Sequence, residues 1–321
     1  MPTPQRSIGS GFGARSTAED VLSEVDLTGR LAVVTGGYSG LGLETTRALA
    51  GAGARVVVPA RRTEAAREAL GALPGVEVDT LDLSDLEDVR AFAGRFLASG
   101  RTVDLIIGNA GIMACPETRV GPGWEAQFAI NHLGHYALVN LLRPAFAPGG
   151  VRVVAVSSAG HHHSGIRWDD VHFRRGYDKW LAYGQAKTAN ALFAVHLDAL
   201  GRNAGVRAFS LHPGRILTPL QRHLPAEEMV ALGWIDEDGE LVDPGFKTAA
   251  QGAATQVWAA TAPELDGMGG VYCEDCDVAP PARADTPFVG VCAHASDPEQ
   301  AARLWALSAE LTGLDSFTTS A

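Results

Sequence analysis

A regular alternation of apolar strand patterns with helical patterns runs through most of this sequence and restricts its fold more than any other feature. The strand-like runs are Leu31–Thr35, Arg55–Pro59, Val76–Leu81, Val103–Gly108, Val151–Ser157, Val206–Leu211 and Gly270–Cys273. The helical runs between them are Leu41–Ala52, Glu64–Leu73, Leu86–Ala98, Trp124–Phe146, Lys179–Arg202 and Phe246–Ala260. Strands that are apolar on both sides must be covered on both faces. We therefore predict a doubly wound α/β fold with a parallel sheet of about seven strands and helices on both faces.

The alternation continues without an internal repeat or a linker, so we expect a single domain over residues 29–321. A loose tail and a short helix over residues 1–28 precede it, and Ser16 with Glu19 is the expected capping box of that helix. Two irregular stretches interrupt the pattern: an insertion at 159–182 and a substrate lid at 217–245. Both follow a strand, at the edge of a parallel sheet where ligands bind.

The composition excludes several classes of protein. Of 321 residues, 46% are hydrophobic and 20% are charged, which indicates a globular chain with a substantial core. The net charge of −11 argues against nucleic acid and anionic membranes as partners, because both require a basic face. No apolar run approaches the roughly 18 residues of a membrane span, and no secretory signal is recognisable. We expect a cytoplasmic protein, and the abundance of Ala, Gly and Arg indicates a bacterial source.

A glycine-rich turn follows the first strand and opens the first long helix. Gly36, Gly40 and Gly42 allow the backbone N–H groups to approach a phosphate at the helix N-terminus. Their spacing differs from the common G-x-G-x-x-G pattern, and a glycine-rich connection without a ligand is the alternative. The position between strand and helix favours phosphate binding.

The end of the second strand bears on the choice of cofactor. An acid at this position would bind the ribose 2′-hydroxyl of NAD, whereas an arginine suits the 2′-phosphate of NADP. The residues from Val56 to Arg62 include Arg61 and no acid, so NADP(H) is favoured over NAD(H). Two alternatives remain: the arginines are solvated charges at the start of a helix, or Glu64 serves NAD.

Tyr183 and Lys187 stand four residues apart in a helical run, so their side chains lie one turn apart on the same face. A free phenol ionises near pH ~10, and a base acting near neutral pH needs roughly 4 kcal/mol of differential stabilisation. A lysine charge about 4 Å away in a partly screened site supplies roughly 4 kcal/mol. We therefore expect Lys187 to lower the pKa of Tyr183, so that this phenol acts as an acid or base beside a cleft.

Aromatic and apolar side chains are concentrated in the insertion and the lid. The insertion includes three adjacent histidines, His161, His162 and His163, for which we expect aromatic packing over the site and no metal, because no supporting set of ligands is recognisable. The lid includes Leu220 and Trp234. A substrate with apolar bulk and ordinary core packing explain these lid residues equally well.

Seven motifs, taken together and in order, resemble those of the short-chain dehydrogenase/reductase superfamily and, within it, the retinol-dehydrogenase-like group. The resemblance extends from about Phe12 to Tyr272. The motifs are Thr35-Gly36-x-x-x-Gly40-x-Gly42, Asp82, Asn109-Ala110-Gly111, Asn131, Ser157-Ser158, Tyr183-x-x-x-Lys187 and Pro213-Gly214-x-x-x-Thr218. This resemblance implies a Rossmann domain that binds a nicotinamide dinucleotide.

The resemblance also implies which residues bind the cofactor. These positions are Gly36, Tyr38, Ser39, Gly40, Leu41, Gly42, Arg61, Asp82, Leu83, Asn109, Ala110, Gly111, Tyr183, Lys187, Pro213, Gly214, Ile216 and Thr218. Asp82 and Leu83 would meet the adenine, and Thr218 with the backbone of Ile216 would hold the nicotinamide carboxamide. Simple turn chemistry is the alternative explanation of Asn109.

The implied catalytic residues are Asn131, Ser158, Tyr183 and Lys187. Successive strand residues point to opposite faces, so only one of Ser157 and Ser158 can address the cleft, and the family pattern selects Ser158. Ser158 would polarise a substrate carbonyl. Asn131 would steady Lys187 through a water, with satisfaction of backbone groups inside a bent helix as the alternative.

Together these features predict an NADP-dependent oxidoreductase that interconverts an alcohol and an aldehyde or ketone, with Tyr183 as acid or base. Two alternatives are a catalytically silent dinucleotide-sensing protein and a reductase of activated C=C bonds. The expected partner is a small carbonyl or alcohol substrate. Family members commonly pair through the helices near Trp124–Phe146 and Lys179–Arg202, so a homodimer is a further expectation.

Overall fold

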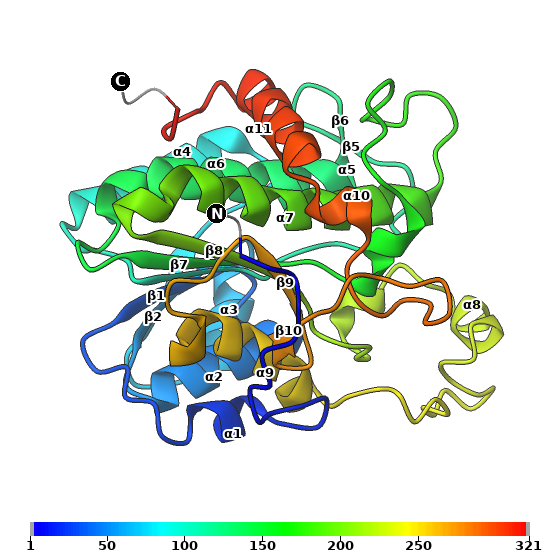
Figure 1. Ribbon diagram of the computed structural model, residues 1–321, viewed down its shortest axis with the longest axis horizontal. Helices are drawn as coiled ribbons and strands as arrows, with labels where there is room; N and C mark the ends of the chain where they lie inside the picture. Colours follow the sequence, from blue (N-terminus) through cyan, green and yellow to red (C-terminus); the bar gives the residue numbers. More distant parts are fainter. Residues whose placement is uncertain (1–2, 319–321) are drawn as a thin grey trace.

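The computed structural model describes residues 3–318, which build an eight-stranded sheet between two layers of helices (Figure 1). The strand order is β10-β9-β8-β7-β4-β1-β2-β3, and β10 pairs antiparallel with β9 whereas the other pairings are parallel. The strands are β1 (Leu31–Val34), β2 (Arg55–Ala60), β3 (Val76–Thr80), β4 (Leu105–Gly108), β7 (Val151–Val156), β8 (Val206–His212), β9 (Val271–Glu274) and β10 (Asp277–Val278). The predicted doubly wound fold is confirmed, with one short antiparallel edge strand beyond the seven expected.

Helices cover both faces of the sheet (Figure 1). On one face lie α1 (Ala18–Leu22), α2 (Gly40–Gly51), α3 (Thr63–Leu70) and α9 (Ala249–Thr261). On the other face lie α4 (Leu86–Ala98), α6 (Gly134–Leu142), α7 (Lys179–Gly201) and α11 (Pro298–Thr312). Within the described residues, none of these helices is long and apolar enough to cross a membrane.

The central strand β1 shows why the strands are continuously apolar. Ala32 and Val34 point to one face and pack in the same cluster as Trp258 of α9. Leu31 and Val33 point to the other face and pack with the helices there. Because successive side chains of a strand alternate between two covered faces, every position of β1 is buried.

The position of β1 also determines where a ligand can bind. β1 pairs with β2 on one side and with β4 on the other, so the chain reverses its direction of winding at this strand. In open parallel sheets, a crevice forms at this switch point, outside the carboxyl ends of the strands. The loops after β1 and β4 meet there.

The N-terminal segment covers one edge of the sheet. The side-chain amide of Gln5 donates to the carbonyl oxygens of Tyr272 (2.7 Å) and Ala279 (2.6 Å), and its oxygen accepts from the Tyr272 backbone N–H. These bonds protect an edge that would otherwise present unpaired backbone groups. The expectation of a loose tail is therefore wrong for this part of the chain.

Helix α1 is capped one residue later than expected. The Thr17 side chain accepts from the backbone N–H of Asp20, and the Asp20 carboxylate accepts from the Thr17 N–H. This is a capping box, but its members are not Ser16 and Glu19. Ser16 instead accepts from the Gly13 N–H and belongs to the preceding turn.

The structure contains further elements that the sequence patterns do not indicate. The short ones are the hairpin β5 (Arg119–Val120) and β6 (Trp124–Glu125), α8 (Ala226–Ala231) and α10 (Ala293–Ser296), and the long one is α11. Helix α11 lies across α7 on the outside of the molecule (Figure 1). Its Trp305 stacks on Phe193 of α7 at 5.9 Å between ring centroids and meets Tyr136 of α6 edge-on at 4.8 Å.

Candidate active site

A cavity of about 1200 Å³ opens at the carboxyl ends of the strands, and most of the predicted site residues line it. The predicted residues in its wall are Gly36, Tyr38, Ser39, Gly40, Leu41, Arg61, Asp82, Leu83, Asn109, Ala110, Gly111, Ser158, Tyr183, Lys187, Pro213, Gly214, Ile216 and Thr218. Two predicted residues, Gly42 and Asn131, lie behind this wall and do not line it. The volume is sufficient for a dinucleotide together with a small substrate.

The glycine turn after β1 has the backbone geometry that phosphate binding requires. Gly36 and Gly40 adopt positive φ angles of +64° and +51°. Ser39, the N-cap of α2, makes no side-chain capping bond, so the N–H groups of the first helical turn face the cavity without a side-chain partner. A helix N-terminus of this kind attracts an anionic group.

Gly42 has a packing role beneath this turn. A Cβ atom at Gly42 would lie 2.3 Å from the Gly36 carbonyl oxygen and 2.5 Å from Nδ2 of Asn109. Both distances are far below a van der Waals contact, and one neighbour is backbone. The absence of a side chain therefore allows α2 to pack against the turn.

We expect the Gly42→Ala substitution to weaken binding of a dinucleotide at least tenfold, because the turn must move away from α2 to accommodate the methyl group. Fluorescence titration with NADPH measures this change. Gly51→Ala, in the last turn of the same helix, has no neighbour within 4 Å and is the matched control. Unchanged affinity in Gly42→Ala would show that the turn does not hold the cofactor.

The end of β2 presents basic side chains to the cavity. Arg61 and Arg62 both line the wall and are exposed, and no ion pair involves them within the described residues. Glu64, the residue that could serve NAD, pairs with Arg67 at 2.6 Å on the exposed side of α3. The geometry therefore directs two cations, and no carboxylate of this segment, toward the cavity.

The loops after β1 and β4 are bonded together at the floor of the cavity. Nδ2 of Asn109 donates to the Thr35 carbonyl oxygen (2.9 Å), and the Ala110 N–H donates to the Thr35 hydroxyl (3.0 Å). The Thr35 hydroxyl also contacts Nε2 of His135 at 2.8 Å. Asn109 thus fixes the turn that carries the glycines, a more specific role than simple turn chemistry.

Tyr183 and Lys187 are buried on α7, whose N-terminus Asp178 caps. Nζ of Lys187 lies 5.6 Å from the centre of the Tyr183 ring and donates to the Val156 carbonyl oxygen at 2.9 Å. Burial raises the pKa of Tyr183 to about 12, against a smaller lowering by a hydrogen bond with Ser158. Burial also lowers the pKa of Lys187 to about 8. The expected dominance of the lysine charge over the pKa of Tyr183 is therefore wrong in this structure, where desolvation dominates.

The two serines after β7 face different surroundings. The Ser157 hydroxyl is buried and donates to the Lys187 carbonyl oxygen at 2.7 Å, which ties β7 to α7. Ser158 lines the cavity, hydrogen-bonds with Tyr183 and accepts from the Gly160 N–H at 3.0 Å. Of the two hydroxyls, the one selected from the sequence is the one that reaches the tyrosine.

Asn131 lies in a π-helical turn, η1 (Ala129–Leu133), that interrupts the helix expected over Trp124–Phe146. Its side chain accepts from the Ile112 N–H and donates to the Ile112 carbonyl oxygen, both at 2.9 Å. Its own carbonyl oxygen contacts Nδ1 of His135 at 2.9 Å. These bonds satisfy backbone groups of Ile112, in the loop after β4, whereas the alternative places such groups inside a bent helix. A Cβ atom placed on Gly111 would lie 3.0 Å from Oδ1 of Asn131 and 3.8 Å from Nζ of Lys187.

The loop after β8 also lines the cavity. Gly214 has a φ of +100°, and a side chain there would collide with Lys247 at 2.7 Å. Thr218 caps η5 (Pro219–Gln221) through a bond from the Leu220 N–H at 3.2 Å and lies close to Gly40. The lid is thereby anchored next to the glycine turn.

Aromatic and apolar side chains from three segments form the wall in front of Tyr183. These residues are His163, Trp180, Leu220, Leu232, Trp234 and Phe288. Trp180 meets Tyr183 at 6.4 Å and Trp234 at 6.5 Å between ring centroids. Phe288 comes from a C-terminal segment that no sequence pattern had indicated, and it packs 5.4 Å from His163. In contrast, Trp168 of the insertion packs against Arg303 of α11, away from the cavity.

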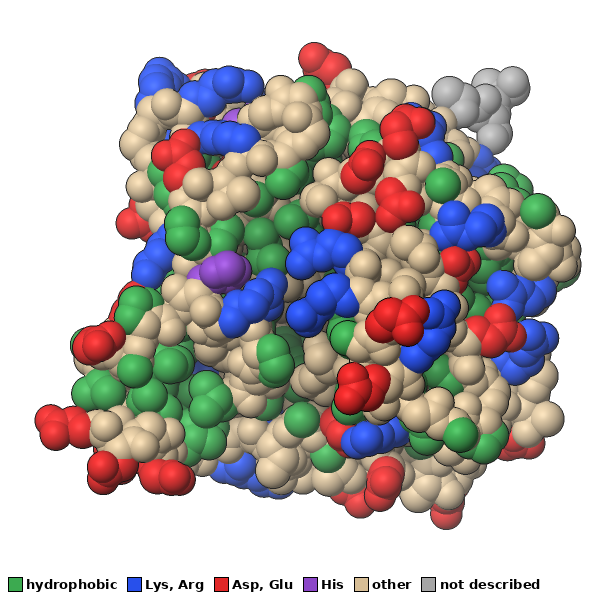
Figure 2. Space-filling model, turned by 180° about the vertical axis from the view of Figure 1, so that it is seen from behind, with side chains coloured by type: hydrophobic (Ala, Val, Ile, Leu, Met, Phe, Trp, Pro, Cys, Tyr) green, Lys and Arg blue, Asp and Glu red, His purple; other side chains and the backbone are tan. Residues whose placement is uncertain are grey.

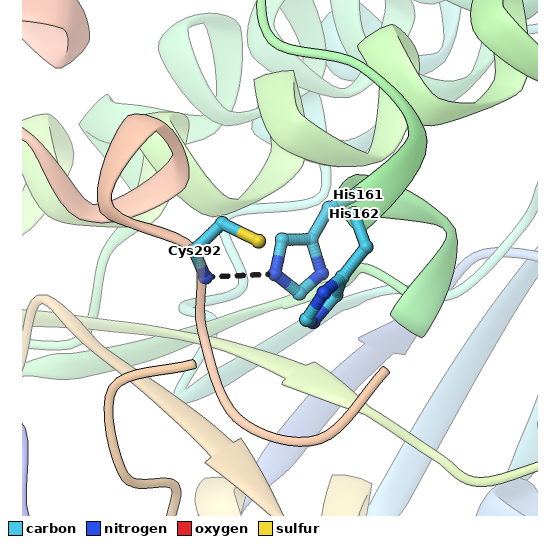
Figure 3. A group of neighbouring side chains, drawn as sticks. All are labelled: His161, His162 and Cys292. Carbon is cyan, nitrogen blue, oxygen red and sulfur yellow. Dashed lines mark hydrogen bonds between the residues drawn. The ribbon is translucent and has the colours of Figure 1, made fainter. Parts of the chain in front are cut away.

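His161, His162 and Cys292 lie together beside this wall, with possible ligand atoms within 4.8 Å of one another (Figure 3). The ring of His161 is fully buried, and both of its nitrogens are already used: Nδ1 lies 2.7 Å from the Ser158 carbonyl oxygen, and Nε2 accepts from the Cys292 N–H at 3.1 Å. Burial lowers the pKa of His161 to about 3, so the ring is neutral. Its hydrogen bonds connect the C-terminal segment to the loop that carries Ser158.

The parallel sheet, the glycine turn and the buried tyrosine and lysine at one cavity define a nicotinamide-dependent oxidoreductase of the Rossmann class. A family model described as short chain dehydrogenase matches residues 30–229. The chain belongs to the short-chain dehydrogenase/reductase family, whose members bind a nicotinamide dinucleotide.

Relatives of known sequence agree with this assignment. A Streptomyces lividans protein named "Probable oxidoreductase" is 46% identical over 296 residues, which cover 89% of this chain and 98% of the relative. Retinol dehydrogenase 12 of Mus musculus is 35% identical over 299 residues, covering 91% of this chain and 89% of the relative. The predicted resemblance to the retinol-dehydrogenase-like group is confirmed.

Solved structures share the fold. An uncharacterized protein from Mycobacterium paratuberculosis matches with a TM-score of 0.71 and 35% identity, covering 94% of this chain and 98% of the other. An NADP active-site complex of Pseudomonas aeruginosa RhlG matches with a TM-score of 0.59 and 25% identity, covering 78% of this chain and 95% of the other.

Proposed function

We propose that this enzyme is an NADP-dependent oxidoreductase that interconverts an alcohol and an aldehyde or ketone. The observation that carries the proposal is the position of the Tyr183 phenol, which lies between Ser158 and Lys187 in the wall of a cavity that also holds the glycine turn. We propose that the enzyme acts in the cytoplasm of a bacterium. Similar proteins from Streptomyces and Mycobacterium support the bacterial source.

The proposed chemistry divides between the cofactor and the chain. The nicotinamide supplies or accepts the hydride when it is bound. In the reducing direction, Ser158 donates a hydrogen bond to the carbonyl oxygen of the substrate, and Tyr183 gives that oxygen its proton as the hydride reaches the carbon. Because burial raises the pKa of Tyr183 to about 12, the phenol carries its proton at neutral pH, as the role of proton donor requires.

The preference for NADP(H) is based on the charges at the end of β2. Arg61 and Arg62 face the cavity, and Glu64 is engaged with Arg67. A 2′-phosphate suits two arginines, whereas a 2′-hydroxyl requires an acid. The NADP complex of the Pseudomonas aeruginosa structure supports the proposal by similarity.

The apolar wall in front of Tyr183 favours a carbonyl compound with apolar bulk. Trp180, Trp234 and Phe288 would surround such a substrate and leave few polar partners for a charged one. Several of these rim side chains are exposed in the structure, with Phe288 at 50% and Leu232 at 45%.

A panel of aldehydes, ketones and alcohols, read by NADPH absorbance, tests activity, cofactor and substrate class together. We expect turnover of apolar carbonyls and a kcat/KM for NADPH at least tenfold above that for NADH, because one charge-assisted phosphate contact is worth about 1.4 kcal/mol or more. Turnover confined to enones would indicate reduction of C=C bonds, and binding of cofactor without turnover would indicate a sensing protein.

A further inference from the structure

The cavity wall has more Lys and Arg side chains than carboxylates, which are those of Asp82, Glu274 and Asp275, although the chain as a whole has a net charge of −11. The cations in its wall are Arg61, Arg62, Lys187, Arg215, Arg222 and Lys247. Two of them have carboxylate partners: Arg215 pairs with Asp243, and Lys247 pairs with Asp275 at 2.5 Å. Lys187 is buried and donates to the Val156 carbonyl oxygen. Figure 2 shows Lys and Arg side chains around a hollow near the middle of one face.

The other three cations, Arg61, Arg62 and Arg222, have no carboxylate partner within the part of the chain that the structure describes. Arg61 and Arg62 come from the end of β2, whereas Arg222 comes from the lid, directly after η5. The hydrogen bond of the Arg222 guanidinium runs back to its own turn, to the Pro219 carbonyl oxygen at 3.0 Å.

Arg222 lines the same cavity as Arg61 and Arg62, and the charges of these two arginines act on it. Burial lowers the pKa of Arg222, and the charges of Arg61 and then of Arg62 lower it further. Like charges brought together from two segments about 160 residues apart repel each other, and an anion between them removes that repulsion. The three arginines therefore favour binding of a negatively charged group at the boundary between the lid and the sheet.

We propose that Arg222 is the third arginine of the 2′-phosphate site, reaching from the lid toward the phosphate that Arg61 and Arg62 contact from the sheet. This inference rests on the proposed preference for NADP(H). It adds that the 2′-phosphate, which distinguishes NADP(H) from NAD(H), also holds the lid in place over the substrate. Planar guanidinium groups on two sides of a phosphate are well suited to this role, since each offers paired N–H donors.

Binding of two nucleotide fragments that differ only by the 2′-phosphate tests the inference without turnover. We expect calorimetry to show that 2′,5′-ADP binds the wild-type protein more tightly than 5′-AMP does. Arg222→Gln should weaken 2′,5′-ADP about tenfold and leave 5′-AMP within twofold. Arg67→Gln, an exposed arginine of α3 that is paired with Glu64 and does not line the cavity, should change neither.

Limited proteolysis with an acid-specific endoprotease reports on the lid itself, because the exposed residues Glu237 and Asp238 lie within it. We expect 2′,5′-ADP to slow cleavage there in the wild-type protein and in Arg67→Gln, and to lose this effect in Arg222→Gln. Protection that persists in Arg222→Gln would overturn the inference.

The fragment titration also separates this inference from the proposed cofactor preference. If Arg61→Gln weakens 2′,5′-ADP and Arg222→Gln does not, the NADP(H) assignment stands and the role of Arg222 is wrong. Equal weakening of both fragments by Arg222→Gln would place it on another phosphate and would also overturn the inference. Equal affinity of the wild-type protein for the two fragments would overturn both.

Discussion

Replacing Tyr183 with Phe is expected to reduce kcat about 1000-fold while the fold and the affinity for cofactor persist. The substitution removes only the phenolic oxygen, which is the proposed proton donor, and positioned acids and bases typically contribute 10²–10⁴-fold. The ring stays in its cluster with Met113 and Leu224, so packing is retained. Single-turnover reduction of an apolar aldehyde, with NADPH binding measured separately, provides the test.

A second buried tyrosine serves as the control for this experiment. Tyr136 lies on α6 with its hydroxyl on the Leu314 carbonyl oxygen and is absent from the cavity wall. We expect Tyr136→Phe to change stability slightly and to leave kcat within a fewfold of wild type. If Tyr183→Phe retained most of the turnover, the assignment of the acid would be wrong.

Replacing Lys187 with Met is expected to abolish turnover and, at pH 7, to raise the free energy of unfolding by about 2 kcal/mol. Burial lowers the pKa of Lys187 from 10.5 to about 8, and at about 1.4 kcal/mol per pH unit this corresponds to a cost of roughly 3 kcal/mol for the charged form. The lost hydrogen bond to Val156 offsets about 1 kcal/mol, since that carbonyl oxygen keeps its bond from Asn190 at 3.0 Å. At position 187, an apolar side chain of similar size therefore gives a more stable fold than the lysine does.

The pH dependence of this gain identifies its cause. Below pH 8 the lysine is protonated in both the folded and the unfolded chain, and the full cost of burying the charge applies. As the pH rises from 8 toward 10.5, the folded state loses the proton first, so the unfolded state binds more protons and the wild-type protein becomes relatively more stable. Denaturant unfolding at pH 7 and pH 10 should show the advantage of Lys187→Met shrinking with pH. Lys179→Met, at the start of the same helix, where the side chain is 31% exposed and paired with Glu228, should show no gain at either pH.

The sequence predicts those parts of the molecule that depend on local order. Strands that are buried on both faces, such as β1, require continuous apolar residues, and this pattern is readable without knowledge of the fold. The glycine turn and the spacing of Tyr183 and Lys187 are equally local. For this reason the predicted residues lie together at one cavity, with Gly42 and Asn131 directly behind it.

Long-range packing accounts for what the sequence did not reveal. Tyr183 is buried against Met113 and Leu224, which are distant in the sequence, so the reversal of the expected pKa effect could not be foreseen from a spacing of four. Likewise, Phe288 and Arg222 reach the cavity from segments with no recognisable motif. The three adjacent histidines are conspicuous in the sequence, but the hydrogen bond between His161 and the Cys292 N–H can be recognised only in the folded chain.

Helix α11 packs on the outer surface of α7, and its Trp305 also reaches α6. Trp305 fills the seam between Phe193 and Tyr136, so a second subunit could reach these side chains only by displacing α11. The apolar surface of α6 and α7 at this seam is thus buried within one chain. Its contribution to stability is intramolecular and therefore does not depend on protein concentration, in contrast to that of an obligate dimer.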